Sequence, residues 1–458
     1  MTANSALILA AGKGTRMKSE KAKVLHEIAG RLMLEWPLSA ATEAGARDIV
    51  VVAGHQADQV RRAVEGHPSV RLAVQEEQLG TGHAVACAMP ELAEVSGPLL
   101  ILCGDTPLLR GNTLARLVET HQKAGAAVTV LTAIMENPFG YGRMIRDSEN
   151  SVKRIVEQKD ATFEEAAVKE INSGIYCMDT DFLRKHIDRI GSENAQNEYY
   201  LTDLLGIAVA EHLTCTAMIA EDPLEIMGVN DRVQLAEASG ILRRRINHRL
   251  MRDGVTIIDP ESAYIDQDVR IGPDTLIWPG AIITGSTEIG RGCTIESGVR
   301  IDDCRISDNV HIKSGSVLEG AEVSSHASIG PMAHLRPGTV LHPHVKIGNF
   351  VETKKAVMGH GSKASHLTYL GDAEIGRDVN IGCGTITCNY DGKNKHRTVI
   401  GDDVFIGSDV QLVAPVTIGR NSLVAAGTTV TTDVPPDSLA IARTPQVNKD
   451  GWRLRKKD

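Results

Sequence analysis

Aliphatic residues recur every six positions over much of the C-terminal half of the chain. Seven isoleucines keep this register from Ile265 to Ile301, and after short slips the pattern continues to Val430. A period of six fits neither the 3.6-residue repeat of an α-helix nor the two-residue alternation of a strand. It fits a triangular solenoid in which each hexad forms one side, three hexads form one coil and the aliphatic residue points inward. A β-sandwich of short strands would not hold phase over so many repeats, so we predict a parallel β-helix over residues 253–458.

Two polar segments interrupt this register, residues 354–370 and residues 385–399. Both contain histidine and glycine in a region that is otherwise aliphatic. Insertions in a solenoid form surface loops, often on the binding face. We therefore expect the functional residues of this half in the two interruptions.

The N-terminal half has a different sequence pattern, in which short apolar runs alternate with segments of helical periodicity. Residues 6–10, 49–53 and 99–103 are near-continuous aliphatic runs typical of buried parallel strands, and residues 112–124 have helical spacing. The first and third runs end in polar, glycine-containing loops, the place where ligands bind in open α/β sheets. We predict a Rossmann-like α/β domain over residues 1–229, joined to the β-helix by a linker helix over residues 230–252.

Composition excludes several classes of protein. The net charge of −9 disfavours general nucleic-acid binding, because nothing offsets the charge of a phosphate backbone. The eight cysteines form no CxxC pair, so neither a zinc site nor a disulfide framework is expected. No apolar stretch has membrane-spanning length, and the N-terminus does not read as a signal peptide. We expect a cytoplasmic protein that acts on small molecules, with neither nucleic acid nor a membrane as partner.

The loop after the first predicted strand has the residues of a phosphate site. Gly12 and Gly14 let the backbone approach a phosphate closely, while Lys13, Arg16 and then Lys23 supply positive charge. A glycine-rich loop alone is a weak signal, and this one has neither the Walker spacing nor the dinucleotide fingerprint.

Several motifs together resemble the sugar-1-phosphate nucleotidyltransferases. They are LAAGKGTRM at residues 9–17 with Lys23, QLGTGH at 78–83, CGD at 103–105, GYGR at 140–143, EINSG at 170–174 and GVN at 228–230. The resemblance implies uridylyl transfer from UTP to a sugar-1-phosphate, with Arg16 and Lys23 stabilising phosphate charge. It implies Mg²⁺ held by Asp105 and Asn230, whose oxygens suit that ion. The implied UTP and sugar contacts are Leu9, Ala10, Ala11, Gly12, Lys23, Gln75, Gly80, Thr81, Gly142, Glu157, Asn172 and Asn230.

The two interruptions and their neighbours carry residues suited to acylating an amine. That reaction needs a base near neutral pH, for which histidine is the natural choice, and a donor for the oxyanion. His366 stands near Lys363 and Tyr369, which favours a functional role over a merely exposed histidine.

Across its full length the chain resembles the bacterial family that joins N-acetylglucosamine-1-phosphate uridylyltransferase to glucosamine-1-phosphate N-acetyltransferase. The resemblance implies a left-handed β-helix, His366 as general base and acetyl-CoA as second co-substrate. It also implies a homotrimer with acyl sites between subunits, and a product used for peptidoglycan and lipopolysaccharide. The implied glucosamine-phosphate contacts are Arg336, Lys354, Tyr369 and Asn380, and the implied acetyl-CoA contacts are Cys383, Asn389, Tyr390, Ser408, Ala426 and Arg443.

Two cysteines depart from the pattern expected of that family. Cys103 stands where a tyrosine is expected, and Cys383 stands where an alanine is expected with its backbone N–H as oxyanion donor. The alternative is a monofunctional nucleotidyltransferase whose β-helix only oligomerises or binds a regulator. The His366 and Asn389–Tyr390 clusters argue against it, because a structural solenoid does not need them.

Overall fold

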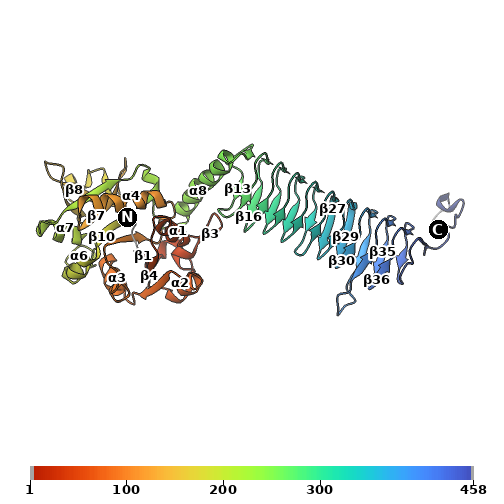
Figure 1. Ribbon diagram of the computed structural model, residues 1–458, viewed down its shortest axis with the longest axis horizontal. Helices are drawn as coiled ribbons and strands as arrows, with labels where there is room; N and C mark the ends of the chain where they lie inside the picture. The colour runs from red at the N-terminus through yellow and green to blue at the C-terminus, as the bar shows by residue number, and fades with distance from the viewer. Residues whose placement is uncertain (1–4, 455–458) are drawn as a thin grey trace. The chain divides into compact units, whose positions relative to one another are not determined.

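The computed structural model describes residues 5–454, and the chain divides into two compact units between Leu242 and Arg243. Unit 1 is built on a mixed sheet in the order β11-β7-β10-β6-β1-β4-β5 (Figure 1). The three strands predicted from the aliphatic runs are confirmed, and β1 pairs in parallel with both of the others. Their bounds are β1 Ser5–Ala10, β4 Asp48–Ala53 and β6 Pro98–Cys103. The remaining strands of this path are β5 Val70–Val74, β7 Val128–Ile134, β10 Glu170–Asp179 and β11 Cys215–Ile219.

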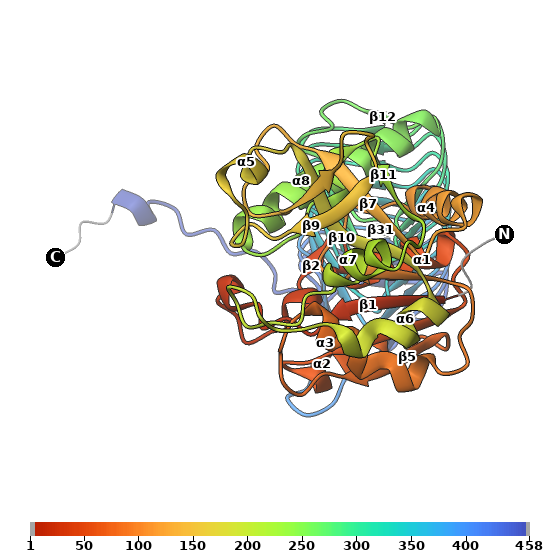
Figure 2. The same cartoon turned by 90° about the vertical axis from the view of Figure 1, so that its left-hand side faces the viewer.

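Helices cover both faces of this sheet because successive residues of each strand point to opposite sides. Ile8 packs in one buried cluster with α1, α2 and α4, while its neighbour Leu7 packs in another with α3, α6 and α7. Figure 2 shows the sheet between its helices. The bounds are α1 Glu35–Glu43, α2 Ala57–Val64, α3 Thr81–Ala88, α4 Gly111–Ala124, α6 Thr180–His186 and α7 Asp203–Ala210. A hairpin of β8 (Gly142–Arg146) and β9 (Val152–Val156) extends from β10, followed by α5 (Phe163–Ala166).

The helix expected between the two halves is α8, Arg232–Arg252. Within unit 1, Ala238 and Leu242 of this helix are buried in a small cluster with Val229. Within unit 2, the Asn247 side-chain amide donates to the carbonyl oxygens of Pro260 (2.7 Å) and Ala263 (3.0 Å).

Unit 2 is a left-handed parallel β-helix of very short strands, from β12 (Thr256–Ile257) to β39 (Leu439–Ala440) (Figure 1). Isoleucines stack from coil to coil: Ile277 pairs with Ile295, and Ile295 pairs with Ile312. All three side chains are fully buried. The hexad pattern therefore marks the inward position of each side, and three hexads complete one coil, as predicted.

The expected interruption at residues 354–370 is wrong. Strands β27 (Lys346–Lys354) and β29 (Lys363–Gly371) continue the coil around a corner, and Ile347 pairs with Ala364 one coil later. Thr353 and Ala364 occupy inward positions and are fully buried, and the Thr353 hydroxyl lies 2.9 Å from that of Thr339. Small and hydroxyl side chains replace isoleucine here, but the path of the chain does not change.

The second interruption is a real excursion. Ile375 pairs with Ile400 and Ile400 pairs with Ile418, so the first of these two coils contains more of the chain than the second. The additional residues lie between β32 (Ile386–Cys388) and β33 (Thr398–Ile400), and the loop projects from the coils in Figure 1.

Candidate active sites

A cluster of polar side chains lies at the carboxyl ends of β1 and β6. The Lys23 ammonium donates to Asp105 Oδ2 at 2.5 Å and to Asn230 Oδ1 at 3.2 Å. The Arg16 guanidinium donates to the same Asn230 oxygen at 2.9 Å. The structure thus brings together both predicted catalytic cations and both predicted metal ligands.

These ligands have the right chemistry for a magnesium ion. The Asp105 carboxylate and the Asn230 amide provide two hard oxygen donors that converge on one point, now occupied by the Lys23 ammonium. Among residues 5–454 there is no group of three or more His, Cys, Asp or Glu residues that could hold a metal. A site of two protein oxygens suits Mg²⁺, which usually takes its other ligands from water and substrate phosphates.

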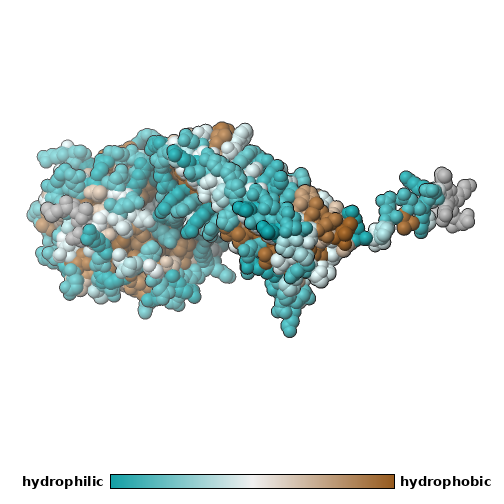
Figure 3. All heavy atoms as spheres, turned by 45° about the vertical axis from the view of Figure 1, so that its right-hand side comes forward, coloured by the Kyte–Doolittle hydropathy of each residue, from teal (hydrophilic) through white to brown (hydrophobic). Residues whose placement is uncertain are grey.

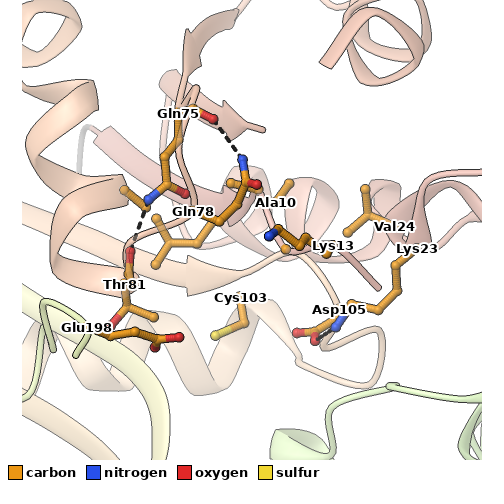
Figure 4. Close-up of a pocket in the computed structure, with 15 residues that line it drawn as sticks. Ala10, Lys13, Lys23, Val24, Gln75, Gln78, Thr81, Cys103, Asp105 and Glu198 are labelled. Carbon is orange, nitrogen blue, oxygen red and sulfur yellow. Dashed lines mark hydrogen bonds and ion pairs between the residues drawn. The ribbon is translucent and has the colours of Figure 1, made fainter. Parts of the chain in front are cut away.

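A cavity of ≈ 420 Å³ begins at this cluster and extends along the glycine-rich loop (Figure 4). Gln75 in this cavity is 2% exposed, and its side-chain amide donates to the Gly80 carbonyl oxygen at 3.1 Å. Gly80 has φ +108°, and a Cβ there would lie 2.6 Å from the Tyr199 carbonyl oxygen. Any larger residue at Gly80 would displace the loop. The predicted residues that line the cavity are Leu9, Ala10, Ala11, Gly12, Lys23, Gln75, Gly80, Thr81 and Asp105.

A second cavity of ≈ 220 Å³ adjoins the first and contains the predicted sugar contacts Gly142, Glu157 and Asn172. Asn172 donates to the Tyr176 hydroxyl at 2.9 Å and accepts from the Gly174 backbone N–H at 3.1 Å, which fixes its orientation. Burial raises the pKa of the Glu157 carboxyl, and the nearby carboxylates of Asp160 and Asp203 raise it further. This cavity therefore offers amide and carboxyl groups suited to sugar hydroxyls.

Cys103 lines both cavities, and Figure 4 shows it among the residues of the first. Its Sγ lies 3.5 Å from the Gly174 carbonyl oxygen, and burial raises the pKa of the thiol to about 12. Cys103 is thus a neutral residue in the wall of both cavities.

Glu198 and Thr202 are among the residues of these cavities that the sequence motifs do not predict. Both lie between α6 and α7, in a segment with neither helical nor strand periodicity. The Tyr199 backbone there bonds to Leu79 and Gly82, which brings the segment against the predicted loop. The cluster of polar residues at 194–198 is the only local signal in the sequence.

In unit 2, the predicted base His366 and four of the predicted acetyl-CoA residues form a column along one edge of the β-helix; these four are Cys383, Ser408, Ala426 and Arg443. His366 pairs with Asn349 of the preceding coil, and its Nδ1 lies 2.9 Å from the Asn349 side-chain oxygen. One coil further, the Gly384 N–H donates to the Leu367 carbonyl, which places Cys383 at the same corner. Backbone bonds continue the column from Cys383 to Asp409 and from Ser408 to Gly427, and Arg443 donates to the Ala426 carbonyl at 2.7 Å.

Bulky residues hold an unusual backbone conformation on the early part of this edge. Met332, Phe350 and Leu367 have φ of 52°, 55° and 40°, and all three side chains are more than half exposed. The left-handed conformation is unfavourable for such residues and tends to occur at functional sites.

The predicted sugar-phosphate residues lie on the side of the coil next to this edge. Arg336 donates to Glu352 at 2.8 Å, and Glu352 pairs with Tyr369 on the next coil. Lys354 follows at the far corner, where its carbonyl accepts from the Asp372 N–H, and the Asn389 amide donates to Asp372 at 2.5 Å.

Asn380 lies apart from this group within one chain, on the neighbouring side of the coil, where it pairs with Lys363. Tyr390 lies on the excursion, with its hydroxyl 2.6 Å from the Gly392 carbonyl oxygen. Glu352 is a further residue of this side that was not predicted from the sequence; its carboxylate raises the pKa of Arg336 through their hydrogen bond. Glu352 is followed by three polar residues, of which Thr353 points inward. Because no aliphatic residue marks the inward position here, the sequence does not show that Glu352 points outward.

None of the helices in the described part of the chain is both long and apolar enough to cross a membrane.

Comparison with known proteins agrees with both units. The model of the MobA-like NTP transferase domain matches residues 6–162, and that of the bacterial transferase hexapeptide repeat matches residues 397–432. A model of the GMPPB C-terminal domain matches residues 253–355. The "Bifunctional protein GlmU" of Trichlorobacter lovleyi is 69% identical over 458 residues, all of both chains. Proteins of the same name from Pelobacter propionicus (67% identical, 99% of this chain and 98% of the relative) and Geobacter sulfurreducens (60%, 99% of each) are also similar. The chain belongs to the GlmU family of bifunctional proteins.

Proposed function

We propose that the chain makes UDP-N-acetylglucosamine in two steps, one in each unit. It is a glucosamine-1-phosphate N-acetyltransferase and an N-acetylglucosamine-1-phosphate uridylyltransferase. The observation that carries this function is the presence of both polar constellations in one chain that matches bifunctional relatives over its whole length. We assign the second reaction to residues 1–229, the first to residues 253–458, and a linking role to residues 230–252.

In the first reaction, the amine of glucosamine-1-phosphate attacks the thioester carbonyl of acetyl-CoA. His366 takes the amine proton through Nε2, because Asn349 Oδ1 holds the proton on Nδ1. The oxyanion of the tetrahedral intermediate accepts from the Cys383 backbone N–H, and collapse expels the CoA thiolate. Arg336 and Lys354 bind the phosphate, and Tyr369 and Asn380 position the sugar, while Asn389, Tyr390, Ser408, Ala426 and Arg443 line the acetyl-CoA path.

In the second reaction, a phosphate oxygen of N-acetylglucosamine-1-phosphate attacks the α-phosphorus of UTP, and pyrophosphate leaves. Gln75, Gly80 and Thr81 read the uracil base, and Gly142, Glu157 and Asn172 hold the sugar. Arg16 and Lys23 stabilise the charge on the phosphates, so that the reaction needs no protein nucleophile. When bound to Asp105 and Asn230, Mg²⁺ supplies Lewis-acid stabilisation of the phosphate oxygens.

The second unit also supports assembly into a homotrimer. Phe405, Leu423 and Leu439 pair in register on successive coils, and all three are more than 40% exposed. Figure 3 shows apolar surface gathered on the C-terminal coils. Solvent-exposed apolar stripes of this kind mark subunit contacts. A second subunit on this side would place further residues beside the His366 edge, where Asn380 now lies apart from the other sugar contacts. The two co-substrates, UTP and acetyl-CoA, are metabolites of the cytoplasm, where we place the enzyme.

A pair of substitutions tests the assignment of each reaction to its unit. Asp105→Ala removes a metal ligand and should abolish UTP turnover while CoA release with glucosamine-1-phosphate continues. His366→Ala removes the base and should lower CoA release by about 100-fold or more while UTP turnover continues. Normal UTP turnover in Asp105→Ala, or normal CoA release in His366→Ala, would refute the corresponding assignment.

The same CoA assay separates this function from the alternative of a monofunctional nucleotidyltransferase. If the β-helix only oligomerises, the wild-type protein will release no CoA from acetyl-CoA in the presence of glucosamine-1-phosphate. That result would favour the monofunctional alternative.

A further inference from the structure

A groove of ≈ 540 Å³ opens at the edge of the unit 1 sheet opposite the nucleotide cavity. It lies where β6 begins and β10 ends, since Pro98 pairs with Asp179, whereas Cys103 at the other end of β6 lines the nucleotide cavity. The residues that line it are Pro98, His121, Gln122, Gly125, Ala126, Ala127, Asp179, Phe182, His212, Leu213 and Thr214. Neither reaction uses any of them.

His121 gives this groove a buried polar group. The side chain is 4% exposed, and its Nδ1 lies 2.9 Å from the Thr129 hydroxyl, which is itself fully buried. Its Nε2 makes no hydrogen bond within residues 5–454 and is not one of the side-chain atoms there that are both fully buried and unpartnered, so it is open to a ligand in the groove.

Asp179 gives the groove its charge. One carboxylate oxygen accepts from the Phe182 N–H at 2.9 Å and caps α6, which leaves the other oxygen for a ligand. No lysine or arginine is among the described residues that line the groove. The carboxyl end of α4, at Gly125, adds the negative end of a helix dipole. The groove therefore attracts a positive charge.

The remaining walls are apolar. Pro98 and Leu213 flank the opening, and Phe182 is almost fully buried beneath it. The volume lies within the usual range for small-molecule sites of ~300–1,000 Å³.

We propose that this groove is a binding site for a small organic cation, a primary amine carried on an apolar group. The ammonium donates to the free oxygen of Asp179 and to His121 Nε2, which accepts when Nδ1–H donates to Thr129. The apolar group of the ligand packs against Phe182 and Leu213.

Benzylamine is a suitable probe, with benzyl alcohol and benzoate as neutral and anionic counterparts of similar shape. Binding is measured by calorimetry on the full chain at pH 7.5, with UTP in excess so that the nucleotide cavity is filled. We expect benzylamine to bind at least about tenfold more tightly than either counterpart, as expected when one charge-assisted hydrogen bond is gained. Equal binding of benzylamine and benzyl alcohol would overturn the proposal without any variant.

Asp179→Asn then locates the site, because asparagine keeps the cap of α6 and removes the charge. Asp181→Asn is the matched control: it lies on the same helix, 84% exposed and paired with Arg184, and does not line the groove. Asp179→Asn should weaken benzylamine binding about tenfold while Asp181→Asn leaves it unchanged. Equal effects of the two substitutions, or no effect of Asp179→Asn, would place the amine elsewhere and end the proposal.

Discussion

At the scale of single residues, Lys23 has two partners that a divalent cation would also use. Its ammonium contacts Asp105 Oδ2 and Asn230 Oδ1, so a metal ion bound to both oxygens requires the ammonium to move. Lys23 and the metal therefore compete for the same oxygens, and UTP phosphates offer the displaced ammonium a new partner. Metal binding and nucleotide binding should be coupled through this one side chain.

We expect Lys23→Met to bind Mn²⁺ about tenfold more tightly than the wild type without nucleotide, because the competing ammonium is gone. Electron paramagnetic resonance of free Mn²⁺ measures this affinity directly. Lys21→Met is the control, since Lys21 is partly exposed and pairs only weakly with Glu27 at 3.5 Å. An unchanged or weaker Mn²⁺ affinity in Lys23→Met would contradict the competition.

A second prediction concerns how the stability of the protein depends on pH, and it rests on Glu157. Burial raises its pKa in the folded protein, so ionisation of this carboxyl disfavours folding. The stability that its protonated form provides is present below the unfolded-state pKa and is lost as pH rises through the folded-state pKa. Glu157→Gln removes this loss.

The melting temperature of Glu157→Gln relative to the wild type should therefore be higher at pH 8 than at pH 4. Differential scanning calorimetry of the unit 1 transition provides the measurement, and Glu164→Gln, at an exposed position on α5, serves as control. A difference in melting temperature that does not vary with pH would show that Glu157 titrates normally.

The sequence predicts most of the residues of the nucleotide cavity because their motifs resemble those of a known family. Gln75, Gly80 and Thr81 are examples, and the structure places all three in one cavity. Glu198 and Thr202 could not be found in this way. They reach the cavities through backbone bonds between distant segments, and no local periodicity encodes such contacts.

At the scale of elements, the excursion between β32 and β33 is an insertion into one coil of an otherwise regular ladder. Its base is held by the Asn389–Asp372 bond and by a 2.7 Å hydrogen bond between His396 Nε2 and Asp391 Oδ2. Tyr390 has a cation, Lys395, 4.7 Å from the centre of its ring. The loop is thus bonded to the coils at its base, and the other two contacts lie within the loop itself.

Deleting residues 390–396 would shorten this coil to the length of the next one, which runs from Ile400 to Ile418. We expect the β-helix to fold with unchanged circular dichroism and uridylyl transfer to persist. Acetyl transfer should fall by about 100-fold, as is typical when groups that position a substrate are lost. Lys393→Ala is the control, because only its backbone N–H contacts Asp391. Full acetyl transfer in the deletion variant would mean that Tyr390 has no part in the reaction.

The β-helix shows where the six-residue aliphatic repeat predicts the structure correctly and where it does not. Isoleucine at every sixth position identifies the inward sites of most coils. The same rule predicts a break at residues 354–370, since Thr353 and Ala364 are not large aliphatics. The hydroxyl of Thr339 satisfies that of Thr353, so the backbone continues without a loop. Such cross-coil pairing is invisible in a linear sequence.

At the scale of the whole molecule, the two units have separate cores and separate polar sites. The contacts described for α8 divide in the same way, with its first half packed in unit 1 and Asn247 bonded within unit 2. Each unit should therefore fold and act without the other.

A fragment of residues 1–252 should retain uridylyl transfer within about threefold of the full chain and release no CoA. A fragment of residues 232–458 should show the reverse pattern. Both keep α8 whole, so that neither exposes a cut helix. Loss of UTP turnover in the first fragment, despite a normal melting transition, would show that the second unit contributes to the nucleotide site.

The parallel ladders of unit 2 also limit how such a chain can change in length. Each coil advances the structure by a single strand spacing and returns the chain to the same side. Adding or removing one coil between Ile265 and Ile301 shifts the distance between the His366 edge and the start of the β-helix by one spacing, ~4.8 Å, while every contact of that edge is kept. Removing a single hexad instead rotates all later residues by one side of the triangle. The distance between the His366 edge and the start of the β-helix can therefore change during evolution only by whole coils.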